Sequence, residues 1–246
     1  MLIPIIDTHV HLDELSDPEG AIKEAREAGL SGIIAVGMDL LSNQKILEYS
    51  HKYPGFVFPA FGYHPWKITI SGIQDNVRFI QDHLEQAVAL GEVGLDYKMP
   101  VEKEIQHRVL EDFLELAWSK KKPVILHCRL SHEIAYRMVH RQDLKKVVFH
   151  WYSGPLDTLK ELLLDGYYIS ATPALAHSPK HREAIAAAPL KQILIETDSP
   201  VTYQGEISSP VQVLRTLTEL SRIKGVEIEE AALKTTQNAR DFFGIT

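Results

Sequence analysis

Potential metal ligands follow apolar runs at several points of this 246-residue chain. They are His9, His11, Glu92, His127, His150 and Asp198. Imidazole and carboxylate groups bind zinc, manganese, nickel and iron in proteins. If these groups were brought together at one end of the fold without a cation, their desolvation and mutual repulsion would cost a large amount of free energy. We therefore expect these residues to converge on a metal site.

Two of these ligands form a His-x-His pair after the first apolar run. Because successive strand side chains alternate between faces, Asp7, His9 and His11 share one side. Two imidazoles about 7 Å apart along a strand can approach one cation if the strand curls at its end. Alone, the pair is as often structural, since histidines also occupy hydrogen-bonded interiors. The polar residues at the other strand ends favour a metal site.

The size of the ligand set indicates two divalent ions, because it exceeds what one tetrahedral zinc needs. If Glu92 bridges, one ion takes His9, His11, Glu92 and Asp198, and the other takes Glu92, His127 and His150. Two ions about 3.5 to 4 Å apart can lower the pKa of a shared water. The two ions, the carboxylates of Glu92 and Asp198 and a bridging hydroxide together carry a net charge of about +1. This charge favours a phosphate ester over a neutral amide as substrate. Zinc, manganese, nickel, iron and magnesium all remain open.

The elements that must position these residues alternate along the chain. Eight runs rich in Val, Ile, Leu and Phe predict buried parallel strands over 2–6, 32–36, 56–61, 87–91, 123–126, 146–149, 167–171 and 192–195. Helical periodicity separates them and is clearest over 101–121. This α/β pattern predicts a (β/α)₈ TIM barrel with its active residues after the strands. An open doubly wound sheet is the alternative, but it would spread the ligands along a line.

Composition narrows the class of protein. We expect residues 1–246 to form a single domain, since no linker or repeat interrupts them. The net charge of −7 argues against a broad basic face for duplex DNA. The lone Cys128 excludes an intramolecular disulfide and a multi-cysteine zinc site. Without a basic leader or a membrane-length apolar run, the chain is expected to be soluble and cytoplasmic.

The motifs together are highly specific in order and spacing. They read Asp7-Thr8-His9-Val10-His11-Leu12, Gly62-Tyr63-His64-Pro65, Gly91-Glu92-Val93-Gly94-Leu95-Asp96-Tyr97, His127-Cys128-Arg129, His150-Trp151-Tyr152-Ser153-Gly154 and Glu196-Thr197-Asp198-Ser199-Pro200. In these motifs the chain resembles the TatD family of metal-dependent deoxyribonucleases, within the amidohydrolase superfamily. The resemblance implies a barrel with two divalent metals. It also implies that Glu92 is the bridging ligand and that Asp198 is a ligand and the proton acceptor for the attacking water.

Three other residues, His64, Arg129 and Trp151, each allow two interpretations. By resemblance His64 is a substrate-side histidine near the scissile phosphate, although it could be a turn residue before Pro65. Arg129 could pair with a phosphate or with a neighbouring carboxylate. Trp151 stands where relatives carry a small residue or Cys; it could stack on a base, but a core aromatic is favoured.

The expected reaction is hydrolysis of phosphodiester bonds by a metal-activated water, with DNA ends or single strands as substrate. No Lys or Arg occurs between Lys191 and Arg215, where many relatives are basic. Because basic residues are missing here, the alternative function is hydrolysis of another ester or amide bond, such as an aminoacyl ester on tRNA or a small cyclic amide. A barrel of histidinol-phosphatase type would need further ligands, and a non-enzymatic scaffold would lack some of those present.

Overall fold

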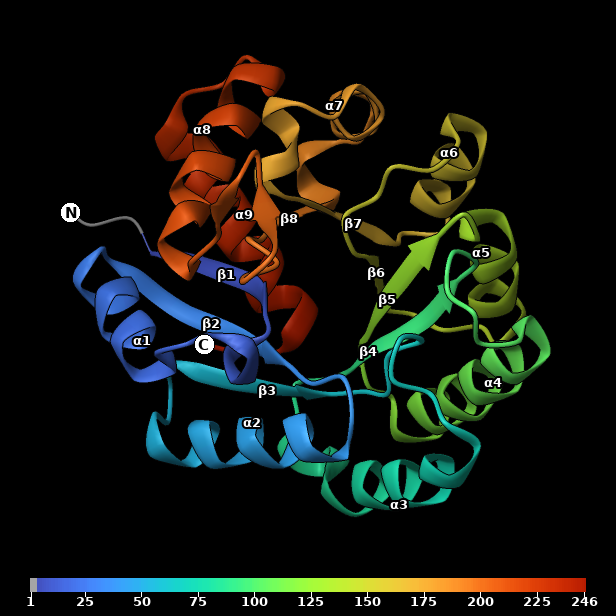
Figure 1. Cartoon of the computed structure of the whole chain (residues 1–246). Helices are drawn as coiled ribbons and strands as arrows, with labels where there is room; N and C mark the ends of the chain where they lie inside the picture. The colour runs from blue at the N-terminus through green and yellow to red at the C-terminus, as the bar shows by residue number, and fades with distance from the viewer. Residues whose placement is uncertain (1–3) are drawn as a thin grey trace.

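The computed structural model describes residues 4–246 and contains eight parallel strands paired in chain order. They are β1 Ile5–Val10, β2 Leu30–Val36, β3 Val57–Phe61, β4 Ala89–Asp96, β5 Val124–Arg129, β6 Val147–Phe149, β7 Tyr168–Ala171 and β8 Ile193–Ile195. Figure 1 shows them around a common centre with the helices outside. The predicted TIM barrel is confirmed, and the open doubly wound sheet is excluded.

Hydrogen bonds close the barrel between its first and last strands. The Thr8 hydroxyl donates to the Ile195 carbonyl at 3.0 Å. Beyond the end of β8, the Asp198 N–H donates to the His9 carbonyl at 3.0 Å and the His11 N–H donates to the Ser199 carbonyl at 2.8 Å. The barrel therefore closes through the backbone of residues that were predicted to bind metal.

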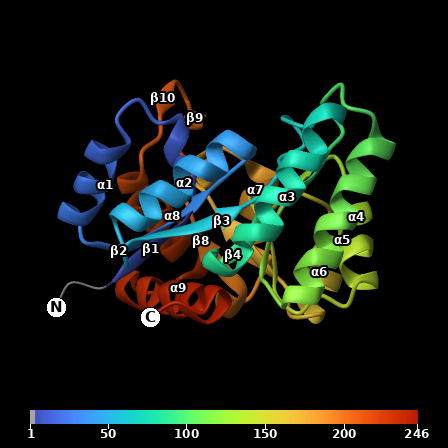
Figure 2. The same ribbon diagram turned by 90° about the horizontal axis from the view of Figure 1, so that it is seen from below.

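Nine α-helices are present among residues 4–246 and cover the barrel. They are α1 Pro18–Glu27, α2 Leu40–Lys52, α3 Ile73–His83, α4 Lys103–Lys120, α5 His132–Arg141, α6 Leu156–Leu164, α7 Pro179–Ala187, α8 Val213–Lys224 and α9 Ile228–Phe243. In Figure 2 most of them flank the strands while α9 lies across the bottom of the view. No helix in this part of the chain is long and apolar enough to cross a membrane.

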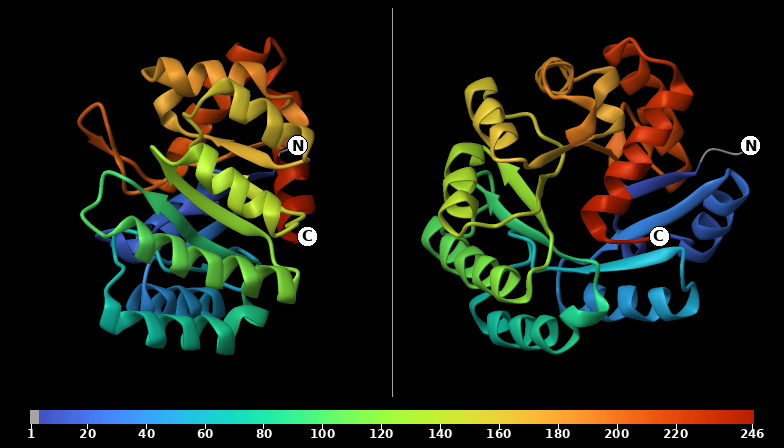
Figure 3. Two further views of the ribbon diagram at one scale, coloured as in Figure 1. Left: turned by 90° about the vertical axis from the view of Figure 1, so that its right-hand side faces the viewer. Right: turned by 180° about the vertical axis from the view of Figure 1, so that it is seen from behind.

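The amino ends of the strands enclose an apolar core inside the barrel. Their inward-facing residues form one cluster with the end of α9, namely Ile6, Ile34, Val36, Ala60, Ala89, Ile125, Val148, Leu194, Ala239, Phe242, Phe243 and Ile245. In the view from behind, α9 crosses this end of the barrel (Figure 3, right). The α9 helix therefore closes the end opposite the predicted site.

Three strands extend beyond the apolar patterns that predicted them. The first was predicted over 2–6, of which residues 2 and 3 lie outside the described part, whereas β1 continues to Val10. Likewise β4 continues to Asp96 and β5 to Arg129. Gly94 permits this because a Cβ there would lie 2.0 Å from the His127 carbonyl oxygen, at a φ of +155°. Several predicted site residues therefore lie within strands rather than in the loops after them.

Candidate metal centre

The six predicted ligands converge at the carboxyl end of the barrel. His9 lies in β1 with His11 just beyond it, Glu92 lies in β4 and His127 lies in β5. His150 follows β6 directly, and Asp198 follows β8. All but His9 line a cavity of about 510 Å³, and His9 is buried beneath it. The convergence predicted from scattered residues is thus present in the fold.

Glu92 lies at the centre of this cluster, and its two carboxylate oxygens face different histidines. Oε2 lies 3.1 Å from His9 Nε2 and 3.5 Å from His11 Nε2. Oε1 lies 2.8 Å from His127 Nδ1 and 3.4 Å from His64 Nε2. A carboxylate shared in this way between two sets of imidazoles has the arrangement expected of a bridging ligand.

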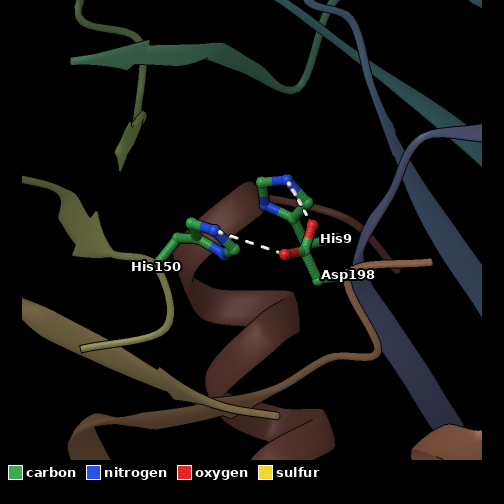
Figure 4. Close-up of side chains that lie close together, drawn as sticks. All are labelled: His9, His150 and Asp198. Atoms are coloured by element: carbon green, nitrogen blue, oxygen red, sulfur yellow. Dashed lines mark ion pairs between the residues drawn. The ribbon is translucent and has the colours of Figure 1, made fainter. Parts of the chain in front are cut away.

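Asp198 and His150 complete the side of the cluster nearest β1. Asp198 Oδ1 is 3.4 Å from His11 Nε2 and 3.6 Å from His9 Nε2, while Oδ2 is 3.8 Å from His150 Nε2. Figure 4 shows this carboxylate with one oxygen directed toward each of the His9 and His150 rings. Asp198 has a φ of +54°, a conformation that a non-glycine residue rarely adopts. The turn after β8 therefore holds Asp198 in a constrained position.

Hydrogen bonds outside the cluster fix which ring nitrogens face inward. His11 Nδ1 donates to the Val36 carbonyl at 2.9 Å, which leaves its Nε2 facing the carboxylates. His150 Nδ1 lies 2.8 Å from Glu196 Oε1, which also accepts from the Ser170 hydroxyl at 2.6 Å. Such outer partners orient histidine ligands in metal sites.

His127 is oriented in the same way by Asp96. Its Nε2 lies 3.3 Å from Asp96 Oδ2, and its Nδ1 faces Glu92. Asp96 Oδ2 also accepts from the Trp66 indole N–H at 2.6 Å and lies 3.8 Å from Arg129 Nη1. Asp96 therefore links a candidate ligand to two side chains on the cavity wall.

Charge in the cluster is balanced by the histidines. Burial alone would raise the pKa of Glu92, but the neighbouring histidines hold it well below its ordinary value. The pKa of Asp198 is lowered in the same way, against its own burial. Burial would lower the pKa of His150, yet the carboxylates of Glu196, Glu92 and Asp198 raise it to about 10. The two carboxylates thus remain ionised and require positive charge beside them.

The donor set fits divalent cations. Three groups have ligand atoms within 4.8 Å of one another, namely His9 with His150 and Asp198, His9 with His11 and Glu92, and His64 with Glu92 and His127. His9 Nδ1 is buried without a hydrogen-bond partner in the described part of the chain. Mixed nitrogen and oxygen donors suit zinc and other first-row divalent ions.

His64, Arg129 and Trp151 each had two interpretations in the sequence, and all three line the metal cavity. His64 is buried and belongs to a candidate ligand group with Glu92 and His127, and burial lowers its pKa to about 4. Arg129 lies loosely beside Asp96, with 45% of its side chain exposed at the cavity. Trp151 is half-buried on the cavity wall, 5.5 Å from the Tyr203 ring, and is not a core aromatic.

Three residues around the ligands were not singled out from the sequence. Glu196 and Asp96 hold His150 and His127, and Trp66 is fixed by Asp96. Asp96 was identifiable, because strand alternation places it on the same face as Glu92 once β4 is extended. Glu196 carried a weaker signal, its position two residues before Asp198. Trp66 carried none.

Known proteins are similar to this chain over its whole length. It is 30% identical to the uncharacterized metal-dependent hydrolase YjjV of Escherichia coli, over 96% of this chain and 97% of the relative. It is 27% identical to the human deoxyribonuclease TATDN3, over 98% of this chain and 95% of the relative. The crystal structure of E. coli YjjV, a TatD homologue, matches with a TM-score of 0.91 at 28% identity and covers 100% of both chains.

The family match agrees with the motifs. Residues 6–244 match the family described as TatD related DNase. This span includes every candidate ligand from His9 to Asp198. The resemblance found in the sequence is therefore confirmed, and the chain belongs to the TatD-related DNases.

Proposed function

We propose that this chain is a metal-dependent phosphodiesterase that cleaves DNA, at ends or in single strands, with two divalent ions. The observation that carries the proposal is the division of Glu92 between His9 and His11 on one oxygen and His127 and His64 on the other. The names of relatives support the DNA substrate, since the human one is called a deoxyribonuclease.

In this proposal Glu92 would contribute a carboxylate oxygen to each of the two ions. His9, His11 and Asp198 would hold one ion with Glu92, and His127 would hold the other. His150 lies 3.6 Å from Glu92 Oε1 and 3.8 Å from Asp198 Oδ2, so it can serve either ion. When bound, the ions supply Lewis-acid stabilisation of charge on the phosphate and lower the pKa of a water molecule.

The chain's own residues position the substrate and move the proton. Asp198 lines the cavity with an ionised carboxylate, and we assign it the role of proton acceptor. His64 is neutral at pH 7 because its pKa is about 4, and a neutral imidazole can donate one hydrogen bond to a phosphate oxygen. Arg129 is half-exposed and can pair with the same phosphate.

The experiment compares bond types on one preparation. The metal-loaded protein is incubated with a labelled single-stranded oligodeoxynucleotide, an aminoacyl-tRNA and a cyclic amide, and product formation is followed for each. We expect cleavage of the oligonucleotide alone, and loss of that cleavage in His127→Ala, which controls for contaminating nuclease. Hydrolysis of the aminoacyl ester or the amide with an intact oligonucleotide would contradict the proposal.

A further inference from the structure

We propose that a second groove, beside the metal cavity, binds the part of a single-stranded DNA that continues from the scissile phosphate. The inference rests on the proposed function. The groove, here called the flanking groove, has a volume of about 750 Å³. Its lining includes Lys98, Arg129, Leu130, Ile134, Leu156 and Lys180.

The flanking groove is continuous with the metal cavity. Cys128, Arg129 and Ser153 line both of them. The shared wall consists of the end of β5 and the turn after β6, two strands that also position His127 and His150. A polymer held with one phosphate beside the metal ligands could therefore extend along Arg129 into the flanking groove. A small ester would fill the cavity alone.

Charge in the flanking groove suits a phosphate backbone. It is lined by three cations, Lys98, Arg129 and Lys180, and by two carboxylates, of which Glu133 is paired with Arg137 at 2.5 Å. Lys98 and Lys180 are exposed and form no ion pair within residues 4–246. In a chain of net charge −7, two unpaired lysines beside the catalytic cavity provide local attraction for an anion.

Exposed apolar side chains line the same groove. Leu130 is 67% exposed, Leu156 is 41% exposed and Ile134 is 40% exposed. Leu130 also has a φ of +58°, which is strained for a residue with a branched side chain. Strain of this kind concentrates at binding and catalytic sites. A groove that offers both apolar surface and cations can contact the unstacked bases and the phosphates of a single strand.

A single strand fits these observations better than a duplex or an acidic peptide. A duplex keeps its base faces stacked and would leave Leu130 and Leu156 without a partner. An acidic peptide would form ion pairs with the cations but offers no planar apolar groups to contact the exposed leucines. We therefore commit to single-stranded DNA.

The test compares two double variants on a long and a short substrate. Lys98→Ala with Lys180→Ala removes the unpaired cations of the flanking groove. Lys191→Ala with Lys234→Ala removes two exposed lysines outside it and is the matched control. The substrates are (dT)₁₂ and bis(p-nitrophenyl) phosphate. Binding of phosphorothioate (dT)₁₂, which resists cleavage, is measured separately by fluorescence anisotropy.

We expect the groove variant to raise KM and Kd for the 12-mers about tenfold, and to lower the slope of log Kd against log salt by roughly 1.4. Its kcat/KM for bis(p-nitrophenyl) phosphate and all values for the control should match the wild type. If the wild type cleaves both substrates but the groove variant equals the control, the flanking groove is refuted and the proposed function stands.

The reverse outcome is distinguishable. If the wild type binds the 12-mer through these lysines but cleaves no phosphodiester, the flanking groove stands and the proposed function fails. A wild type that neither binds nor cleaves refutes both. Displacement of the 12-mer by polyglutamate of equal charge, at equal concentration, would contradict the choice of a single strand.

Discussion

The two ends of the barrel are made by the same strands but filled in opposite ways. At the amino ends, residues such as Ile34, Ile125 and Leu194 pack against Phe242 of α9 and exclude water. At the carboxyl ends, Glu92 and Asp198 are buried among imidazoles. Apolar burial stabilises the fold, whereas burial of charge costs free energy unless a cation compensates it. Stability and chemistry can therefore be changed separately in this molecule.

The largest expected effect is at the carboxyl end. Glu92→Gln should lower kcat/KM for a phosphodiester by at least about 10³-fold, because the charge that faces both groups of histidines is lost. It should also abolish the stabilisation by added Zn²⁺ or Mn²⁺, which for the wild type should reach about 2.7 kcal/mol at a hundred times Kd. Steady-state kinetics and urea unfolding measure these. A Glu92→Gln variant that is still stabilised by metal would show that Glu92 is not needed to hold the ions.

At the amino end the opposite result is expected. Phe242→Ala should lower the free energy of unfolding by about 3–5 kcal/mol, because it leaves a cavity under the closed end of the barrel. Its kcat/KM, measured well below the melting temperature, should stay within about twofold of the wild type. Leu233→Ala, on the same helix but 57% exposed in the wild type, is the control and should change stability by less than about 0.5 kcal/mol. Equal losses in both variants would mean that α9 does not close a packed core.

A smaller effect concerns His181 of α7, which is buried against the segments that follow β6 and β7. Its Nδ1 donates to the Tyr152 carbonyl at 2.7 Å, and its Nε2 accepts from the Thr172 N–H at 3.1 Å. Burial lowers the pKa of His181 to about 4, whereas the unfolded chain has a histidine pKa of about 6.5. The unfolded state therefore binds the proton first. The stability due to neutral His181 is complete above about pH 6.5 and is lost as the pH falls toward about 4.

The variant His181→Gln isolates this contribution. Between pH 7 and pH 5 the wild type should lose about 2 kcal/mol more stability than the variant. Urea unfolding at both pH values measures the difference. Identical pH dependence in the two proteins would show that His181 is protonated, or accessible to protons, in the folded state.

The sequence predicted the barrel and the six convergent residues because each strand core is continuously apolar and the ligands follow it in order. It placed the ends of β1, β4 and β5 too early, since inward side chains at a polar mouth interrupt the apolar pattern. Asp96 was missed for that reason. His64 joins Glu92 because Gly62 lets β3 approach the β4 backbone, where a Cβ would lie 2.3 Å from the Glu92 nitrogen. This contact is tertiary and leaves no periodic signal.

Trp151 shows a second limit of sequence reasoning. Its place on the cavity wall depends on a φ of +44° and on Tyr203 of the hairpin formed by β9 Thr202–Tyr203 and β10 Glu206–Ile207. Neither follows from strand or helix periodicity.

The proposed chemistry requires cations held at the carboxyl end of the barrel. The decisive measurement is the metal content per chain, by inductively coupled plasma mass spectrometry, of gently purified wild type and Glu92→Gln after dialysis. We expect about two divalent ions per wild-type chain and fewer than about 0.5 in the variant. A wild type without metal, or a variant that retains the full complement, would contradict this expectation.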